Sequence, residues 1–279
     1  MKGPENMRVA AVNDLSSFGK CSLIADISVL TSMGIEVCPV PTAVLTAQTG
    51  FPSYYMHDTG DMVGHCKEEW NKMGVTFDGV LTGYMPSEQV ADSVLDFVIS
   101  FAGKDNVLVV DPVMGDGGRC YSNFSEKLFT KIKKLAAIAD MITPNLTELL
   151  LLAGEDPKRA ESGIMNEKDA EEIIEIANKV RSAEGQSIVV TGIPGNEGEL
   201  CNLVVYPGGT QVIKCKSNGK SYSGTGDLFA AFLLGNILSG KDIVTAVSKA
   251  TELIGEAIGK TASADRNYGV DFEKILKSF

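Results

Sequence analysis

Short apolar runs alternate with longer amphipathic stretches along most of this 279-residue chain. The short runs are typical of strands buried in a sheet, and the longer stretches, whose apolar residues recur every three or four positions, are typical of helices packed on it. The expected strands are 9–12, 37–40, 80–82, 108–110, 141–143 and 188–191. The expected helices are one ending at Gly34, one ending near Gly74, and 87–101, 126–138, 167–183, 227–238 and 242–260. This alternation predicts an α/β fold with a mostly parallel central sheet and helices on both faces.

The second half of the chain departs from this regular pattern. Residues 200–206 and 211–216 predict a β-hairpin, with its turn at 207–209. The most polar irregular stretches, 154–166 and 194–199, are expected to be loops or a flap over a nucleotide. A hydrophobic content of 44% allows one large core, so residues 7–279 are predicted to form a single domain. Residues 1–6 are expected to be a frayed tail or an expression remnant outside it.

A group of small residues beside one carboxylate precedes the apolar helix expected at 227–238. The group is Gly224, Thr225, Gly226 and Asp227. Small residues let the N–H groups of a helix N-terminus approach an anion closely, and the helix dipole favours a phosphate there. Asp227 would then lie in the first turn, where a kinase needs its base. The same residues are also typical of an ordinary N-cap, so this segment alone leaves both interpretations open.

Two further polar clusters each follow an expected strand. Asp111 and Asp116 follow one, and Asn145 and Glu148 follow the next. In open α/β sheets ligands collect beyond the carboxyl ends of the strands, so these side chains are expected to come together. Carboxylate oxygens suit Mg²⁺, which takes few protein ligands and completes its shell with water and phosphates. Each residue alone is also compatible with a loop or a helix cap, but together the clusters favour phosphoryl transfer from a nucleotide.

The order of these motifs resembles that of the ribokinase superfamily, and within it the pyridoxal, pyridoxine and pyridoxamine kinases of vitamin B6 salvage. The matching segments are 13–19 (NDLSSFG), 40–51 (VPTAVLTAQTGF), 82–84 (TGY), 111–115 (DPVMG), 143–148 (TPNLTE), 190–192 (VTG) and 223–229 (SGTGDLF). A lone GTGD is weak evidence, whereas seven segments in family order cover nearly the whole chain from Met7. The resemblance implies a ribokinase-like three-layer α/β/α sandwich and an ATP-dependent kinase of a B6 vitamer.

The resemblance also implies roles for individual residues. Asp227 resembles the general base that takes the proton of the substrate hydroxymethyl group, and the N–H groups of Gly224, Thr225 and Gly226 resemble the anion hole for the transferred phosphoryl group. The residues implied on the nucleotide side are Asp111, Asn145, Glu148, Thr191 and Thr225. Of these, Asp111 and Glu148 resemble the ligands of the Mg²⁺ that accompanies ATP, with Glu148 acting through metal-bound water. Assistance by a monovalent cation such as K⁺ is left open.

Substrate-side residues implied by the resemblance are Asp14, Thr49 and Tyr84, in addition to Asp227. Asp14 stands where many pyridoxal kinases carry a Ser that meets the pyridine ring. An Asp can pair with a protonated ring nitrogen, whereas a Ser can donate to a neutral one. Asp at this place also resembles the hydroxymethylpyrimidine kinases of thiamine synthesis. Tyr84 is expected either to stack beside an aromatic ring or to be a buried strand-end residue.

Net charge and apolar run lengths restrict the partners. A formal net charge of −11 argues against a surface for nucleic acid or for an anionic membrane. No apolar run reaches the roughly 20 residues of a membrane span, so a cytoplasmic protein is expected. The resemblance implies a homodimer with ATP and a B6 vitamer as its small-molecule partners.

The six cysteines show no CxxC and no paired spacing, which argues against disulfides and zinc. Cys120 and Cys215 lie near the expected phosphate loops, and reaction of either thiol with a substrate aldehyde is left open. His57 is expected to be solvated or capping, unless 41–58 acts as a lid over the substrate.

Three functions therefore remain. The first is a kinase of the 5-hydroxymethyl group of pyridoxal, pyridoxine or pyridoxamine, and it is the one predicted. The second is a hydroxymethylpyrimidine kinase on the same scaffold, favoured by Asp14. The third is a non-catalytic B6-binding protein, against which the intact Gly224–Asp227 segment argues.

Overall fold

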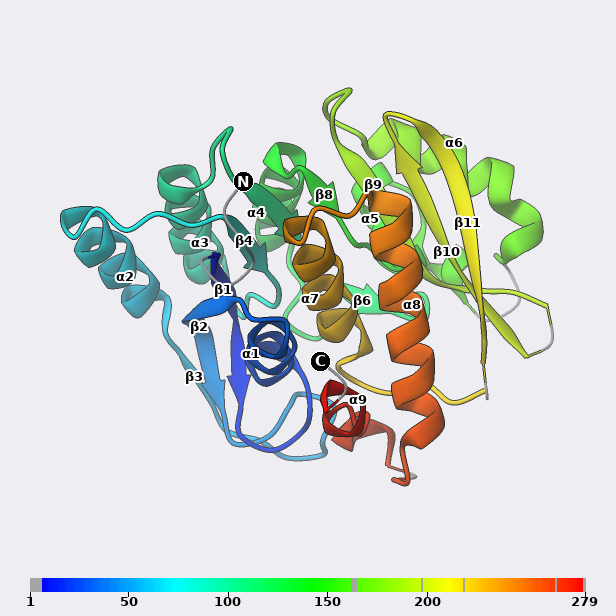
Figure 1. Ribbon diagram of the computed structural model, residues 1–279, viewed down its shortest axis with the longest axis horizontal. Coiled ribbons are helices and arrows are strands. Elements are labelled where there is room, and N and C mark those ends of the chain that lie inside the picture. The colour runs from blue at the N-terminus through cyan, green and yellow to red at the C-terminus, as the bar shows by residue number, and fades with distance from the viewer. Residues whose placement is uncertain (1–6, 162–164, 197, 218, 264, 278–279) are drawn as a thin grey trace.

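The computed structural model describes residues 7–161, 165–196, 198–217, 219–263 and 265–277, so the expected tail 1–6 lies outside the described residues. These residues form a nine-stranded sheet with the strand order β11-β10-β9-β8-β5-β4-β1-β2-β3 (Figure 1). Its strands are β1 (Arg8–Ser16), β2 (Glu36–Leu45), β3 (Met56–Asp58), β4 (Gly79–Thr82), β5 (Val107–Val110), β8 (Met141–Ile142), β9 (Ser187–Pro194), β10 (Glu199–Tyr206) and β11 (Gly209–Lys216). A small separate ribbon pairs β6 (Gly115–Asp116) with β7 (Arg119–Cys120).

The centre of the sheet is parallel, as predicted. Strands β2, β1, β4, β5, β8 and β9 run parallel to one another. The predicted hairpin is β10 and β11, which pair antiparallel with Tyr206 opposite Gly209. At the other edge, β3 pairs antiparallel with β2. The expected α/β class is thereby confirmed.

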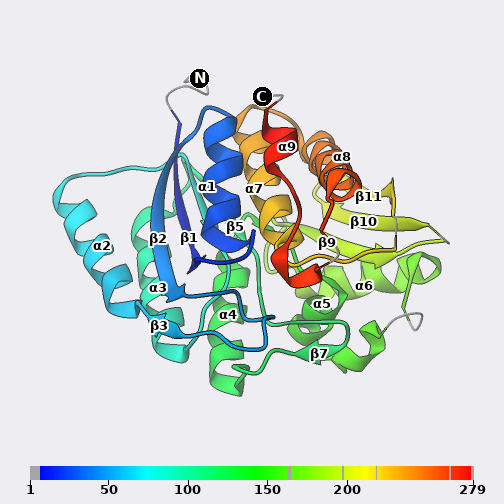
Figure 2. The same cartoon turned by 90° about the horizontal axis from the view of Figure 1, so that it is seen from below.

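Helices cover both faces of the sheet and complete three layers (Figure 2). One face carries α1 (Ser22–Ser32), α7 (Thr225–Leu238), α8 (Ile243–Lys260) and the short α9 (Glu273–Leu276). The other carries α2 (Gly60–Lys72), α3 (Glu88–Phe101), α4 (Glu126–Ile138), α5 (Leu146–Ala153) and α6 (Ala170–Val180). Short 3-10 turns lie at Pro157–Ala160, Glu167–Asp169 and Arg266–Tyr268. Among the helices of the described segments, none combines the length and apolar character of a membrane span.

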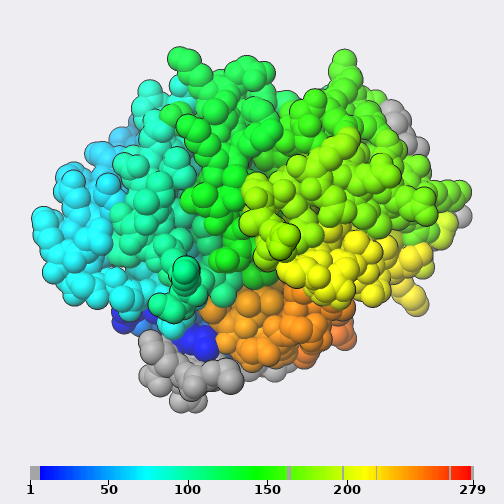
Figure 3. Space-filling view, turned by 90° about the horizontal axis from the view of Figure 1, so that it is seen from above, coloured from blue at the N-terminus to red at the C-terminus, as the bar shows by residue number. Residues whose placement is uncertain are grey.

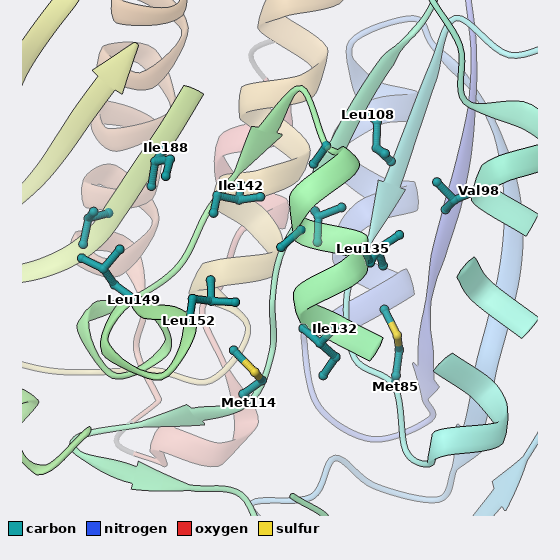
Figure 4. Packing of buried hydrophobic residues seen from close by; sticks show 14 of the residues in the cluster. Met85, Val98, Leu108, Met114, Ile132, Leu135, Ile142, Leu149, Leu152 and Ile188 are labelled. Atoms are coloured by element: carbon teal, nitrogen blue, oxygen red, sulfur yellow. The ribbon is translucent and has the colours of Figure 1, made fainter. Parts of the chain in front are cut away.

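Successive strand residues contribute to opposite cores, because side chains alternate across a sheet. In β4, Val80 packs into the core under α2–α6, and Leu81 packs into the core under α1, α7 and α8. Figure 4 shows the first of these cores, where Ile142 and Ile188 from the strands meet Leu135 and Leu149 from the helices. Seen from one end, the molecule extends from the cyan α2 region at one edge to the yellow β10–β11 region at the other (Figure 3).

Several elements differ from the sequence-based expectation. Helix α5 was not predicted, because its apolar residues form one unbroken cluster that shows no helical period. The expected helix 167–183 is shorter: the Asn166 side chain closes a 3-10 turn over Glu167–Asp169, and α6 ends at Val180. The expected loop 41–58 is partly strand, since β2 continues to Leu45 and β3 pairs with it.

The strand order places a topological switch point at β1. The connection from β1 leads to β2 on one side, and the chain then crosses to β4 on the other side. Ligands in open α/β sheets bind beyond the carboxyl ends of strands at such a point. The pairing register between β1 and β2 also shifts between Asn13 and Leu15, and irregularities of this kind re-aim side chains. Asn13 and Asp14 therefore lie at the end of β1 where a ligand is expected to bind.

We expect Phe97→Ala to lower the free energy of unfolding by about 3–5 kcal/mol. Phe97 is fully buried on α3, and its ring lies 5.8 Å from Trp70 and 4.7 Å from Phe101, measured between centroids. Urea denaturation measures the change. The matched control is Ile99→Ala on the same helix, where the side chain is 64% exposed and the expected loss is within about 0.5 kcal/mol. Equal losses for the two variants would contradict the assignment of Phe97 to the core.

Candidate active site

Helix α7 begins at Thr225 without a side-chain cap. Its N-cap is Gly224, whereas the side chains of Ser87, Ser125 and Asp242 cap α3, α4 and α8. The first N–H groups of a helix have no partner within the helix, and together with the dipole they attract anions. The start of α7 therefore lacks the side-chain cap that an ordinary capping segment would supply.

Close approach of the chain explains the glycines before Asp227. Gly224 has φ +83°, and a Cβ there would lie 2.3 Å from the carbonyl oxygen of Lys20. Only glycine fits such a position without moving the backbone. A Cβ on the exposed Gly226 would lie 3.4 Å from Oδ2 of Asp111. The structure therefore brings the Asp111 carboxylate to the first turn of α7, as the sequence predicted.

Asp227 lies half-buried in this first turn. Its Oδ1 accepts a hydrogen bond of 3.0 Å from Nδ2 of Asn13 on β1. Burial raises the pKa of Asp227, while the backbone N–H of Ser22 and the Asn13 amide oppose that rise by favouring the ionised form. Ser22 begins α1 with φ +54°, a strained conformation for a residue other than glycine. The base candidate thus sits where the N-termini of α1 and α7 meet.

Asp14 follows Asn13 on β1 and is only 5% exposed. Its Oδ2 accepts a 2.8 Å hydrogen bond from the Ser16 hydroxyl group. Burial raises the pKa of Asp14 to about 6, the Ser22 and Ser16 hydroxyl groups oppose this, and the charge of Asp227 adds to it. The charge of Asp227 therefore acts on Asp14. Such proximity is expected of a base and a residue that binds the substrate.

Asn145 and Glu148 form a capping box at the start of α5. Oδ1 of Asn145 accepts from the Glu148 N–H at 3.0 Å, and Oε2 of Glu148 accepts from the Asn145 N–H at 2.9 Å. Oε1 of Glu148 also accepts from the N–H of Met114 at 3.1 Å, and Nδ2 of Asn145 donates to the Gly115 carbonyl at 2.8 Å. Both side chains thus hold the loop after β5 against α5, in addition to any contact with a ligand.

Burial, with repulsion between neighbouring acids added to it, raises the pKa of the nucleotide-side carboxyl groups. Burial and the charge of Asp227 raise the pKa of Asp111 to about 8. Burial and the charge of Asp111 raise the pKa of Glu148 well above its usual value. No cluster of three or more His, Cys, Asp or Glu side chains placed to hold a metal occurs among the described residues. Two crowded carboxyl groups fit Mg²⁺, which takes one or two protein carboxylates and fills its shell with water and phosphate oxygens.

The remaining predicted residues take varied positions. Thr191 lies beside Asn145 through a parallel bridge, and its N–H donates to the Pro144 carbonyl at 2.9 Å. Tyr84 is half-buried, and burial, with the charge of Asp14 added to it, raises the pKa of its hydroxyl group. Thr49 is exposed in the segment between β2 and β3. The Thr225 hydroxyl donates to the Tyr222 carbonyl at 3.1 Å.

The segment around Thr49 is held by the C-terminal part of the chain. Nε2 of Gln48 donates to the Asn267 carbonyl at 2.8 Å, and Nδ2 of Asn267 donates to the Gly50 carbonyl at 2.8 Å. The carbonyl of Arg266 accepts from the Ser223 N–H, next to the anion-hole segment, at 3.0 Å. This C-terminal 3-10 turn therefore joins the expected substrate loop to the start of α7.

Asp116 lies at the same side of the site but already has a partner. Its Oδ2 accepts from the Arg266 guanidinium group at 3.0 Å, and both side chains are about half exposed. All six cysteines are free thiols, and burial raises the pKa of both Cys120 and Cys215, which disfavours the reactive thiolate. His57 lies exposed on β3.

Three residues of the site had no role assigned from sequence: Asn13, Ser22 and Asp26. Asn13 bonds to Asp227 and also to Asp26, which is buried in α1 with 1% exposure. A sequence signal existed, because Asp26 is the one acid in an otherwise apolar or small-residue helix, SLIADISVLTS. A charged residue on such a face is rare unless it has a specific partner.

Known proteins resemble this chain in sequence and fold. The family model described as phosphomethylpyrimidine kinase matches residues 17–270. This chain belongs to that family. The hydroxymethylpyrimidine/phosphomethylpyrimidine kinase of Aquifex aeolicus is 27% identical over 95% of this chain and 99% of its own length. The extent of these matches supports the family resemblance that the order of the motifs indicated.

Solved structures agree in fold. A Bacteroides thetaiotaomicron protein named for phosphomethylpyrimidine kinase, in a crystal form with pyridoxal, has a TM-score of 0.87 and 33% identity, covering 98% of this chain and 95% of that one. Pyridoxal kinase from Lactobacillus plantarum has a TM-score of 0.87 and 25% identity, covering 98% and 96%. The predicted resemblance to B6 kinases of the ribokinase-like superfamily is confirmed.

We expect Asp14→Asn to remove a pH dependence of stability. The folded-state pKa of Asp14, about 6, lies above the unfolded value, so the folded protein holds the proton more tightly. Its contribution to stability is therefore fully present below about pH 4 and is lost as the pH rises through 6. Relative to Asp14→Asn, the wild type should lose roughly 3 kcal/mol of unfolding free energy between pH 4 and 7. Denaturant titrations at several pH values measure this, and a constant difference would contradict the shifted pKa.

Proposed function

We propose that this protein transfers the γ-phosphoryl group of ATP to the 5-hydroxymethyl group of pyridoxal, pyridoxine or pyridoxamine. The observation that carries the proposal is the position of Asp227. It stands in the first turn of α7, next to Gly226, which lies against the Asp111 carboxylate, and its charge acts on both Asp14 and Asp111. A hydroxymethyl kinase requires a base close to both a substrate-side acid and a metal-side acid. Similarity to pyridoxal kinases supports the same activity.

Asp227 acts as the general base in this proposal. Its ionised carboxylate, favoured by Asn13 and Ser22, takes the hydroxymethyl proton as the oxygen attacks the γ-phosphorus. The oxygen–phosphorus bond to the substrate forms as the bond to the ADP leaving group breaks. The N–H groups of Gly224, Thr225 and Gly226 receive the negative charge on the equatorial oxygens. Phosphoryl transfer needs mainly positioning and charge stabilisation, and these residues supply both.

On the nucleotide side, Asp111 and Glu148 would hold Mg²⁺, with Glu148 acting through a bound water because its oxygens also accept backbone N–H bonds. The metal supplies charge neutralisation for the ATP phosphates when bound. Asn145 uses one Nδ2 hydrogen on Gly115, so the second can donate to a phosphate. Thr191 and Thr225 complete the nucleotide side. We further propose a cytoplasmic homodimer, as the family resemblance implies.

On the substrate side, Asp14 would pair with a protonated ring nitrogen, and Tyr84 would lie beside the ring. Thr49 would approach the vitamer from the segment tethered by Asn267. The second candidate substrate is hydroxymethylpyrimidine, because Asp14 can also pair with an aminopyrimidine and because the Aquifex relative carries that name. The pyridoxal-bound neighbour, which is more similar to this chain, favours the B6 vitamer.

An ADP-release assay with Mg·ATP and each candidate substrate tests the function. We expect turnover on at least one of pyridoxal, pyridoxine and pyridoxamine, and little on hydroxymethylpyrimidine. Asp227→Ala should lower kcat at least 1,000-fold, a loss of roughly 4 kcal/mol in transition-state stabilisation, while ATP binding measured by calorimetry changes little. Omission or addition of K⁺ in the same assay shows whether a monovalent cation assists.

The matched control for this variant is Asp242→Ala, which removes an acid from another helix N-terminus. Asp242 caps α8 by accepting from the Thr245 N–H at 3.0 Å, so its loss should cost about 1 kcal/mol of stability without loss of turnover. Equal loss of ATP binding and turnover in Asp227→Ala would assign that residue a structural role. Turnover on hydroxymethylpyrimidine alone would support the second candidate function and contradict the first.

Asp111→Asn tests the metal side. Removing this charge should raise the Mg²⁺ concentration that gives half-maximal turnover by about tenfold, because one anionic ligand is lost. Asp116→Asn serves as the control, since Asp116 is paired with Arg266 and is expected to change the Mg²⁺ requirement less than twofold. Turnover measured at saturating ATP over a series of Mg²⁺ concentrations gives both values. An unchanged Mg²⁺ requirement in Asp111→Asn would remove Asp111 from the metal site.

A further inference from the structure

Asn13 uses its whole amide group in four hydrogen bonds. Nδ2 donates to Oδ1 of Asp227 at 3.0 Å and to Oδ2 of Asp26 at 3.1 Å. Oδ1 accepts from the N–H of Asp14 at 3.0 Å and from the N–H of Tyr84 at 2.8 Å. An amide has two donor hydrogens and two acceptor lone pairs, so every one is used. If the amide were flipped, its oxygen would face the carboxyl oxygens of Asp26 and Asp227, and its N–H groups would face the backbone N–H groups of Asp14 and Tyr84. These contacts would be repulsive, so the orientation of the Asn13 amide is fixed.

The amide also has a steric support. A Cβ on Gly83 would lie 2.5 Å from Cγ, Nδ2 and Oδ1 of Asn13, closer than real Cβ contacts allow. The Asn13 amide therefore lies directly against the backbone of Gly83. This explains the glycine between Thr82 and Tyr84, because any larger residue would push the amide away from Asp227.

Asp26 has an environment that stability alone does not explain. It is 1% exposed on α1, its Oδ2 accepts the Asn13 bond, and its Oδ1 has no hydrogen-bond partner among the described residues. Burial and the charges of Asp227, Asp111 and Asp14 raise its pKa well above the usual value. A buried polar atom without a partner costs free energy, and an apolar side chain of similar volume avoids that cost. Because an apolar residue would avoid this cost, we infer that the Asp26 carboxyl oxygen is needed as the hydrogen-bond acceptor for Asn13.

We propose that Asp26 is a positioning residue for phosphoryl transfer: it holds one hydrogen of the Asn13 amide so that the other is aimed at the base Asp227. The same amide, through its oxygen, fixes the backbone of Asp14 and Tyr84 on the substrate side. One rigid group therefore sets the distance between the base and the substrate-reading residues. Small displacements of such groups are costly, since about 1 Å can reduce rates by about 100-fold.

The test compares two variants at one position. Asp26→Leu is nearly isosteric but removes the acceptor for Asn13, whereas Asp26→Asn keeps a carbonyl oxygen there. We expect Asp26→Leu to lower kcat on the preferred B6 vitamer by about 10- to 100-fold, with KM for ATP and for the vitamer within about threefold of wild type and with unchanged or higher Tm. Asp26→Asn should recover at least about tenfold of the kcat lost in Asp26→Leu. This inference rests on the proposed function.

The control is Gln186→Leu, which breaks buried hydrogen bonds far from Asp227. Nε2 of Gln186 donates to the carbonyls of Ala136 and Ala139 at 2.7 and 2.8 Å, just before β9 begins. This variant should lower Tm and leave kcat near the wild-type value at temperatures below the transition. A general loss of stability and a loss of base positioning are thereby separated.

Each outcome has one meaning. Wild-type kcat in a folded Asp26→Leu, or equal kcat losses in the Leu and Asn variants, would overturn the positioning role. The positioning role would also be overturned if Asp26→Leu lowered Tm and lost no more kcat than Gln186→Leu does at an equal loss of Tm. Absence of turnover by the wild type itself would instead defeat the proposed function. Should Asp26→Leu not fold, Asp26→Ala replaces it, since the smaller side chain lacks the same acceptor.

Discussion

Crowding of carboxyl groups that are largely removed from water is the constraint around which this site is built. Burial raises the pKa of Asp14, Asp26, Asp111, Glu148 and Asp227, and like-charged neighbours add to that rise for all of them except Asp227. Neutral donors oppose this repulsion: the Asn13 amide, the Ser16 hydroxyl and backbone N–H groups. Under the proposed function, such a site would repel a free nucleotide and would receive one whose charge is already neutralised by a metal. Catalysis and metal dependence would then have one electrostatic origin.

The fold supplies the donors by bringing two helices to the same point. Helices α1 and α7 both start without side-chain caps, and they pack side by side on one face of the sheet (Figure 2). Between them, β1 ends at the switch point of the strand order, where its irregular pairing with β2 carries Asn13 and Asp14. Rigid strands and helix termini hold these groups more firmly than loops could.

Much of this could be predicted from sequence because parallel strands end at one edge. Asp111, Asn145 and Asp227 each follow or begin a strongly apolar element, so their convergence follows from the α/β alternation alone. The positions of Asn13 and Asp26 could not be predicted in the same way. Their contact depends on the rotation of α1 over β1, which no periodicity specifies, and the tether from Asn267 to Gly50 joins segments 217 residues apart. Helix α5 escaped prediction because a fully buried helix lacks an amphipathic pattern.

The hydrogen bond between Asn13 and Asp227 joins residues 214 positions apart. The amide of Asn13 on β1 therefore gains its second carboxyl partner, Asp227, only after most of the chain has been synthesised. A polypeptide emerging from the ribosome can build most of the parallel sheet early, but the proposed base cannot take its position until α7 docks against α1. Long-range closure of this kind is slow relative to local folding. A chain that ends before α7 therefore lacks the proposed base, and the contact between Asn13 and Asp227 can form only after most of the chain has been synthesised.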